Sequence, residues 1–83
     1  MFEYWTIISH RDLDFKDDSG KEVKGVQLFL SRRCSERGWH GYEVSKFFIR
    51  EGSEVLAKPL PEPGTDIQIG FNRFGKISYL EVV

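Results

Sequence analysis

TDIQIGFNRFGKISYLEVV, residues 65–83, decides the fold prediction, because it contains the clearest alternation in the chain. In an extended strand every second residue lies on the same face. One face of the first eight residues would carry Thr65, Ile67, Ile69 and Phe71. The segment NRFG then forms a turn, with Gly75 where a left-handed residue is needed, and KISYLEVV returns as a second strand. The stretch therefore predicts an antiparallel hairpin.

Two segments nearer the beginning also have strand character. FEYWTIIS, residues 2–9, is rich in β-branched and aromatic residues, which suit a half-buried pleated surface. In VKGVQLFLSRR, residues 23–33, one face would carry Val26, Leu28 and Leu30 toward the core. Between them, Asp-Asp-Ser-Gly supplies turn-forming residues, so a hairpin is expected within residues 10–25.

The middle of the chain is harder to assign. In YEVSKFFIR, residues 42–50, three apolar side chains have helical spacing, but the length, the aromatic content and the flanking glycines favour a strand. CSERGWHG, residues 34–41, is expected to be a loop. Three prolines within residues 59–63 exclude a sheet interior and indicate an extended surface connection. Five short strands without a long helix predict an all-β fold, a small five-stranded antiparallel barrel.

Composition limits the class of protein. A chain of 83 residues, 40% hydrophobic and 30% charged, is expected to be one soluble domain spanning residues 1–83. No apolar run suits a transmembrane helix and residues 1–15 lack the features of a signal peptide, so we expect a cytoplasmic protein with no membrane partner. Cys34 is the single cysteine and is expected to be a free thiol.

The net charge of −1 and the pI of about 6.1 argue against a protein that wraps nucleic acid through bulk electrostatics. The charge is nevertheless uneven along the sequence. Residues 32–50 contain Glu36 and Glu43 but five cations, which gives this segment a local charge of +3. These cations are Arg32, Arg33, Arg37, Lys46 and Arg50.

No pattern in the sequence indicates catalysis or a cofactor. His10 and His40 have no neighbours that would make them metal ligands or a general base, and Cys34, although it follows two arginines, fits an incidental free thiol better than a nucleophile. DLDFKDDSG would place Lys16 at the third ligand position of a calcium loop, so a solvated acidic turn is expected there. We therefore expect no catalytic residue, no metal and no cofactor.

Aromatic residues occur beside cations at positions where a core residue is not expected. Phe29 falls on the polar face of its predicted strand, Trp39 lies between glycines, and Phe74 lies at the predicted tip of a hairpin. Such pairs of rings and cations are typical of single-strand binding, because bases stack on rings and phosphates need positive charge. Three alternatives stay open: Phe29 under the proline-rich connection, Trp39 plugging one end of the barrel, and Phe74 against a partner subunit. Either Phe47 or Phe48 should face inward, and Tyr4 and Trp5 belong to the core or an interface.

Residues 19–83 resemble the helix-destabilising, single-stranded-DNA-binding proteins of filamentous phages. The resemblance is carried, in order, by the segments SGKEVKGVQLFL, YEVSKFFIREG, PEPGTDIQI and RFGKISYLEVV. It implies an OB-like barrel, a symmetric dimer and cooperative coating of single strands in replication or transfer of a phage or mobile element. It also implies that Phe74 stacks on bases and that Lys21 contacts DNA. The family's stacking tyrosine has no counterpart, since Val23 stands at that position.

We therefore predict sequence-independent binding of single-stranded DNA, or of RNA, by a homodimer that is not an enzyme. The expected contacts are the three rings and seven cations Lys21, Phe29, Arg32, Arg33, Trp39, Lys46, Arg50, Arg73, Phe74 and Lys76. The alternative is a small protein-interaction or regulatory module that uses the same exposed rings as hot spots.

Overall fold

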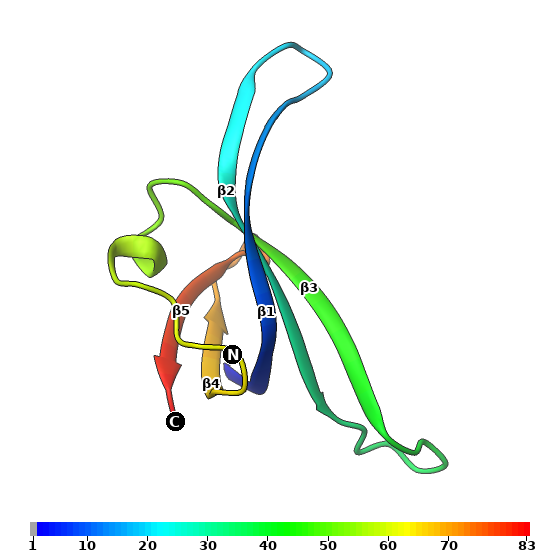
Figure 1. Ribbon diagram of the computed structural model, residues 1–83. Coiled ribbons are helices and arrows are strands. Elements are labelled where there is room, and N and C mark those ends of the chain that lie inside the picture. Colours follow the sequence, from blue (N-terminus) through cyan, green and yellow to red (C-terminus); the bar gives the residue numbers. More distant parts are fainter. Residues whose placement is uncertain (1) are drawn as a thin grey trace.

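The computed structural model describes residues 2–83, which form a single sheet of five antiparallel strands in the order β3-β2-β1-β4-β5 (Figure 1). The strands are β1 (Phe2–Lys16), β2 (Glu22–Arg33), β3 (Tyr42–Arg50), β4 (Asp66–Phe71) and β5 (Ile77–Val82). Within this range helical structure is limited to the 3-10 turn η1 (Glu54–Ala57), and no helix there has the length and apolar character needed to cross a membrane. The prediction of an all-β antiparallel fold is confirmed.

The sheet is curled but its ladder is open. β3 and β5 are the two edges, and no hydrogen-bonded pairing joins them within residues 2–83. Ile49 of β3 and Ile77 of β5 nevertheless belong to the same buried cluster. The ring centroids of Phe47 in β3 and Phe71 at the end of β4 lie 5.5 Å apart. Side chains therefore fill the space between the two halves of the sheet where strand pairing does not.

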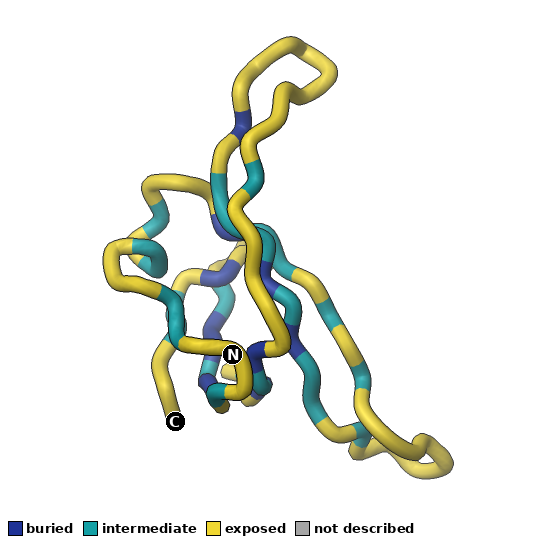
Figure 2. Tube along the Cα trace, in the orientation of Figure 1, coloured by how far each residue is buried: buried dark blue, intermediate teal, exposed yellow. Residues whose placement is uncertain are grey.

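The core lies on the inner side of this curl. The most deeply buried side chains come from three strands, and the predicted alternations in β2 and β4 are confirmed; these side chains are Ile7, Leu28, Leu30, Ile67 and Ile69. Figure 2 shows the buried segments gathered where the strands cross, while the long hairpin and the β2–β3 loop reach into solvent. Phe47 packs against the core and Phe48 does not, as expected for neighbours in a strand.

One extra residue interrupts the pairing of β1 with β2. Ile7 pairs with Leu30, but the next pair is Ser9 with Phe29, so Ile8 has no partner and forms a β-bulge. Because side chains alternate with a period of two, the bulge exchanges the faces of β1. Odd-numbered residues face the core before Ile8, and even-numbered residues lie on that side after it.

The bulge results from two registers that differ by one residue. The core fixes Ile7 opposite Leu30, and the hairpin turn fixes Lys16 opposite Glu22. β1 has nine residue steps between these pairs and β2 has only eight. The first strand, expected to end at residue 9, therefore continues to Lys16 and forms one side of a long hairpin arm, residues 9–27, with its turn in the expected region.

The β1–β2 and β4–β5 hairpins end in turns of the same construction, DDSGK at 17–21 and NRFGK at 72–76. In each turn one side-chain oxygen, Oδ1 of Asp17 or Asn72, accepts backbone hydrogen bonds from the third and fifth residues at 2.9–3.0 Å. The fourth residue is glycine with positive φ in both turns. Asp18-Ser19 and Arg73-Phe74 therefore occupy equivalent positions, and the turn requires neither a ring nor a cation there.

Arg32 covers one end of the core. Its guanidinium carbon lies 4.0 Å from the ring centroid of Trp5, which is 6% exposed. The same guanidinium donates to Oε1 of Glu3 at 3.3 Å and to Oε1 of Glu43, and Nε1 of Trp5 donates to Glu3 at 2.9 Å. Arg32 is thus held in a partly buried ion-paired network on the core side of β2.

We predict that Arg32→Ala lowers the free energy of unfolding by about 1–2 kcal/mol, because it removes a cation–π contact and two ion pairs. Arg33→Ala is the matched control: Arg33 is exposed on the opposite face, and its loss should change the free energy by less than about 0.5 kcal/mol. Urea unfolding followed by tryptophan fluorescence measures both. Equal destabilisation by the two variants would contradict this description of Arg32.

The pKa of Asp17 lies below its ordinary value of 3.8, mainly because the Ser19 hydroxyl donates to the carboxylate, with further contributions from the backbone N–H of Lys21 and the charge of Arg50. A lowered carboxyl pKa stabilises the fold above the unfolded-state pKa, and this contribution disappears as the pH falls through the folded-state pKa. Asp17→Asn, which copies Asn72, should therefore fold equally well at pH 7 and lose less stability below about pH 4. Acid titrations of both proteins by circular dichroism test this; identical acid transitions would refute it.

Candidate nucleic-acid interface

The side of β1, β2 and β3 that faces away from the core forms one continuous surface, called here the outer face. Its residues follow from the register, since cross-strand partners share a face. From β2 and β3 they are Val23, Gly25, Gln27, Phe29, Ser31, Arg33, Tyr42, Val44, Lys46, Phe48 and Arg50. From β1 they are Phe2, Tyr4 and Thr6 before the bulge, and Ser9, Arg11, Leu13 and Phe15 after it.

Charges are sorted between the two sides of these strands. The outer face carries no carboxylate within β1–β3, and its cations are Arg11, Arg33, Lys46 and Arg50. The acids of the same strands lie on the core side: Glu3, Asp12, Asp14, Glu22 and Glu43. The net charge of −1 therefore hides a positive surface, because the excess of acid lies elsewhere.

Rings stand between these cations. Phe29 is half-buried at the centre of the outer face, next to Lys46 of β3, and the guanidinium carbon of Arg11 lies 5.9 Å from its ring centroid. Tyr42, 71% exposed, pairs with Arg33 near the β2–β3 loop. Cation and ring thus occur side by side at successive positions, the arrangement that a stacked base with its phosphate requires.

The hairpin arm adds an edge-to-face ring pair. The centroids of Phe15 and Phe48 lie 6.4 Å apart at an interplanar angle of 63°. Phe48 lies over Gly25, where a Cβ atom would come within 2.6 Å of the ring and 2.3 Å of the Ile49 carbonyl oxygen. Glycine at this position therefore lets the ring pack down on the outer face.

Six of the predicted contact residues follow a single line along β2 and β3. The line begins at Trp39 in the β2–β3 loop, which is 64% exposed, so that ring does not plug an end of the core. It reaches the far end of the molecule at the β1–β2 turn (Figure 1). In order, the six are Trp39, Arg33, Lys46, Phe29, Arg50 and Lys21.

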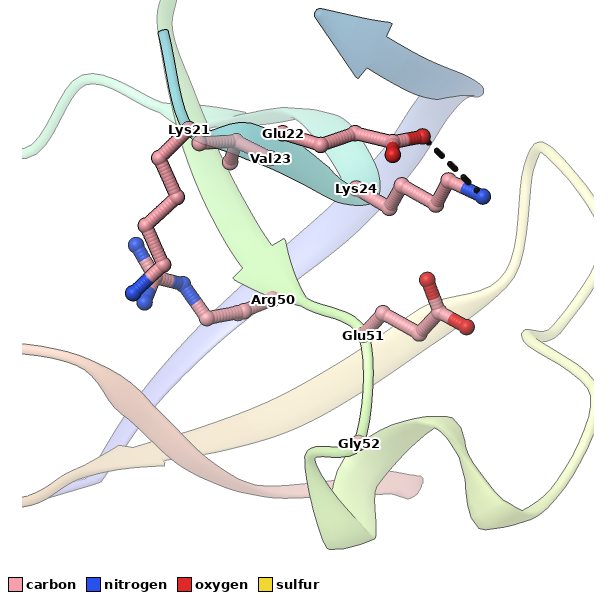
Figure 3. Close-up of a pocket in the computed structure, with 7 residues that line it drawn as sticks. All are labelled: Lys21, Glu22, Val23, Lys24, Arg50, Glu51 and Gly52. Atoms are coloured by element: carbon pink, nitrogen blue, oxygen red, sulfur yellow. Dashed lines mark ion pairs between the residues drawn. The ribbon is translucent and has the colours of Figure 1, made fainter. Parts of the chain in front are cut away.

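At the arm end of this line, Lys21 and Arg50 line one shallow depression and direct their nitrogen atoms to the same side (Figure 3). Within residues 2–83, neither forms an ion pair. Lys24, Glu22 and Glu51 line the same depression, but Figure 3 shows their charged ends on its other side, where Nζ of Lys24 lies 3.2 Å from Oε1 of Glu22. Its pKa is raised mainly by the hydrogen bond to Glu22 and by that carboxylate's charge, with Asp14 and Glu51 adding to the effect. Two cations therefore stay available for an anion, and a third is already neutralised.

Four predicted residues lie away from the outer face. Arg32 belongs to the network over Trp5 on the core side, so its charge is already paired. Arg73, Phe74 and Lys76 lie in the β4–β5 turn, where Phe74 is 72% exposed and the guanidinium carbon of Arg73 lies 5.0 Å from its ring centroid. This turn is a second, separate site of a ring with cations.

Several outer-face residues were not predicted from the sequence, namely Tyr4, Arg11, Phe15, Tyr42 and Phe48. Arg11 and Phe15 belong to this face only because of the bulge at Ile8. Gly25 was the available signal for Phe48, since a strand glycine permits close approach of a ring. No group of three or more potential metal-ligating side chains comes together in the described part of the chain.

Comparison with protein-family models, curated proteins and solved structures gives no match to this chain. The resemblance to the phage proteins stays a prediction that rests on the segments quoted above.

Proposed function

We propose that this protein binds single-stranded nucleic acid, DNA in the first place, without sequence preference. The observation that carries the proposal is the outer face of β1–β3, which combines rings with four cations and no carboxylate. Each stacked base contributes about 1–3 kcal/mol, so a few rings supply useful affinity without a large net charge. Phosphate contacts by Arg11, Arg33, Lys46 and Arg50 add a component that salt weakens.

The proposal includes the finer features that the phage resemblance implies. The curled sheet would act as an OB-like barrel in which side chains, and not strand pairing, join β3 to β5. The protein would form a homodimer in the cytoplasm and coat single strands during replication or transfer of a phage or mobile element. In this complex, either a base or the partner subunit would cover the ring of Phe74.

A fluorescently labelled oligothymidine tests the proposal. At low salt we expect micromolar or tighter binding, and the logarithm of the association constant should fall with the logarithm of salt concentration with a slope near −3, about −0.7 for each of four to five phosphates. Lys46→Gln should reduce the slope by about 0.7. Lys58, an exposed cation of the proline-rich connection, provides the control. Lys58→Gln should leave the salt slope unchanged. Absence of binding up to tens of micromolar protein would refute the function; an oligouridine titration tells RNA from DNA.

Phe74→Ser tests the ring at the β4–β5 turn. The change places at this position the residue that the β1–β2 turn carries in Ser19, so the turn and the stability should be retained. We expect the affinity for oligothymidine to fall roughly tenfold, the equivalent of one lost stacking contact. Sedimentation of the free protein shows whether the ring instead holds a dimer together. Unchanged affinity together with unchanged mass would exclude both roles of Phe74.

The alternative function is a protein-interaction module. The observation that favours it is a pair of exposed carboxylates, Asp12 and Asp14, on the core side of the hairpin arm, because such a pair suits a basic group of a partner. This module would bind no oligonucleotide at low salt, and reversing these two charges would abolish capture of its partner. The oligothymidine titration therefore separates the two functions.

A further inference from the structure

We propose that a bound single strand lies lengthwise along the β2–β3 ladder, from Tyr42 to a phosphate clamp formed by Lys21 and Arg50. This inference deepens the proposed function and rests on it. Its basis is the placement of the cations, which are spread along the ladder. Arg33 lies at one end, Lys46 and Arg11 lie on either side of Phe29 at the centre, and Arg50 lies at the other end.

The ladder is long enough for several nucleotides. Eight residue steps separate Tyr42 from Arg50 in β3, which at about 3.3 Å per residue corresponds to roughly 26 Å. A strand stacked as in a duplex would place about eight nucleotides over that length, at about 3.4 Å each. Small barrel domains bind at least about four nucleotides, which corresponds to a more extended strand. The lengthwise path therefore predicts a contact site of about four to eight nucleotides.

A path across the strands fits the charges less well. From β1 to β3 the distance is only two strand spacings, about 10 Å, which accommodates about three stacked nucleotides. A crosswise strand that passed over β1 at Phe2–Thr6 and continued would meet β4, which pairs with that part of β1, and then β5. The side of those strands that continues the outer face carries the exposed carboxylates Asp66 and Glu81 and no cation. Repulsion between these carboxylates and phosphates would direct the strand away from β4.

The clamp defines the arm end of the path. Lys21 comes from the β1–β2 turn and Arg50 from the last position of β3, and both side chains reach into the same depression (Figure 3). Their backbone positions are well supported, because Asp17 anchors the Lys21 N–H at 2.9 Å and Arg50 pairs with Gly25 in the ladder. Two unpaired cations at one point attract a phosphate more strongly than a single one does, and the carboxylates that line the same depression, Glu22 and Glu51, lie on its other side. Lys24 takes no part, since Glu22 already neutralises it.

The length of the site is measured with oligothymidines of two to eight nucleotides and the wild-type protein. The lengthwise path predicts that affinity keeps increasing, about threefold or more for each nucleotide added beyond three, until the site is filled at about four to eight nucleotides. A plateau at three nucleotides would overturn the lengthwise path and leave the proposed function intact. If no oligonucleotide binds, the proposed function fails, and this inference fails with it.

The clamp is measured with Lys21→Gln, Arg50→Gln and the matched control Lys24→Gln, each titrated with an octathymidine over a range of salt concentrations. Either clamp variant should weaken binding about fivefold at low salt and reduce the magnitude of the salt slope by about 0.7, the loss of one phosphate contact. Lys24→Gln should change neither quantity. Equal effects of Lys21→Gln and Lys24→Gln, or no effect of either clamp variant, would overturn the clamp. Circular dichroism confirms that each variant is folded.

Discussion

The structure depends on the one-residue mismatch that the bulge at Ile8 absorbs. Burial of Ile7 against Leu30 fixes one register, and the Asp17-anchored turn fixes another. A regular ladder would satisfy only one of them, because a slip of one residue moves every side chain to the opposite face. With the bulge, the core is filled and the arm places Arg11 and Phe15 beside Phe29 and Phe48.

The separation of acids and cations between the two faces of the sheet follows from the alternation of side chains along each strand. Arg32 and Arg33 are neighbours in sequence, yet one stacks on Trp5 and pairs with Glu3 and Glu43, and the other is exposed on the outer face. A strand carries residues of both kinds, so its net charge says little about either face. For this reason a chain of net charge −1 presents a positive surface that carries rings. The β1–β2 turn has the same hydrogen bonds with Ser19 at the position of Phe74, so the geometry of the β4–β5 turn does not require the Phe74 ring.

Much of the fold was predictable because it follows from local patterns. The alternation around Ile67 and Ile69 and around Leu28 and Leu30 gave β4 and β2, and glycine with asparagine or aspartate gave both hairpin turns. The bulge was not predictable, because no single residue encodes it: it arises when a distant core contact and a local turn demand different registers. The opening between β3 and β5 likewise depends on how strongly the sheet curls, which is a property of all five strands. Six of the predicted contact residues lie along the β2–β3 line in the structure. Arg32 lies on the other face of β2, because neighbouring side chains of a strand point to opposite faces.

The most direct test of this account is the register of the arm, measured by cross-strand nuclear Overhauser effects in the free protein. The account predicts contacts between the ring protons of Phe15 and Phe48, and between the side chain of Arg11 and those of Phe29 and Gln27, to which Nε of Arg11 donates at 2.9 Å. Contacts from the side chain of His10 to Gln27, without any from Arg11, would mean that β1 has no bulge. The outer face would then carry Asp12 and Asp14 in place of Arg11, and these two carboxylates would offset most of the charge of Arg33, Lys46 and Arg50.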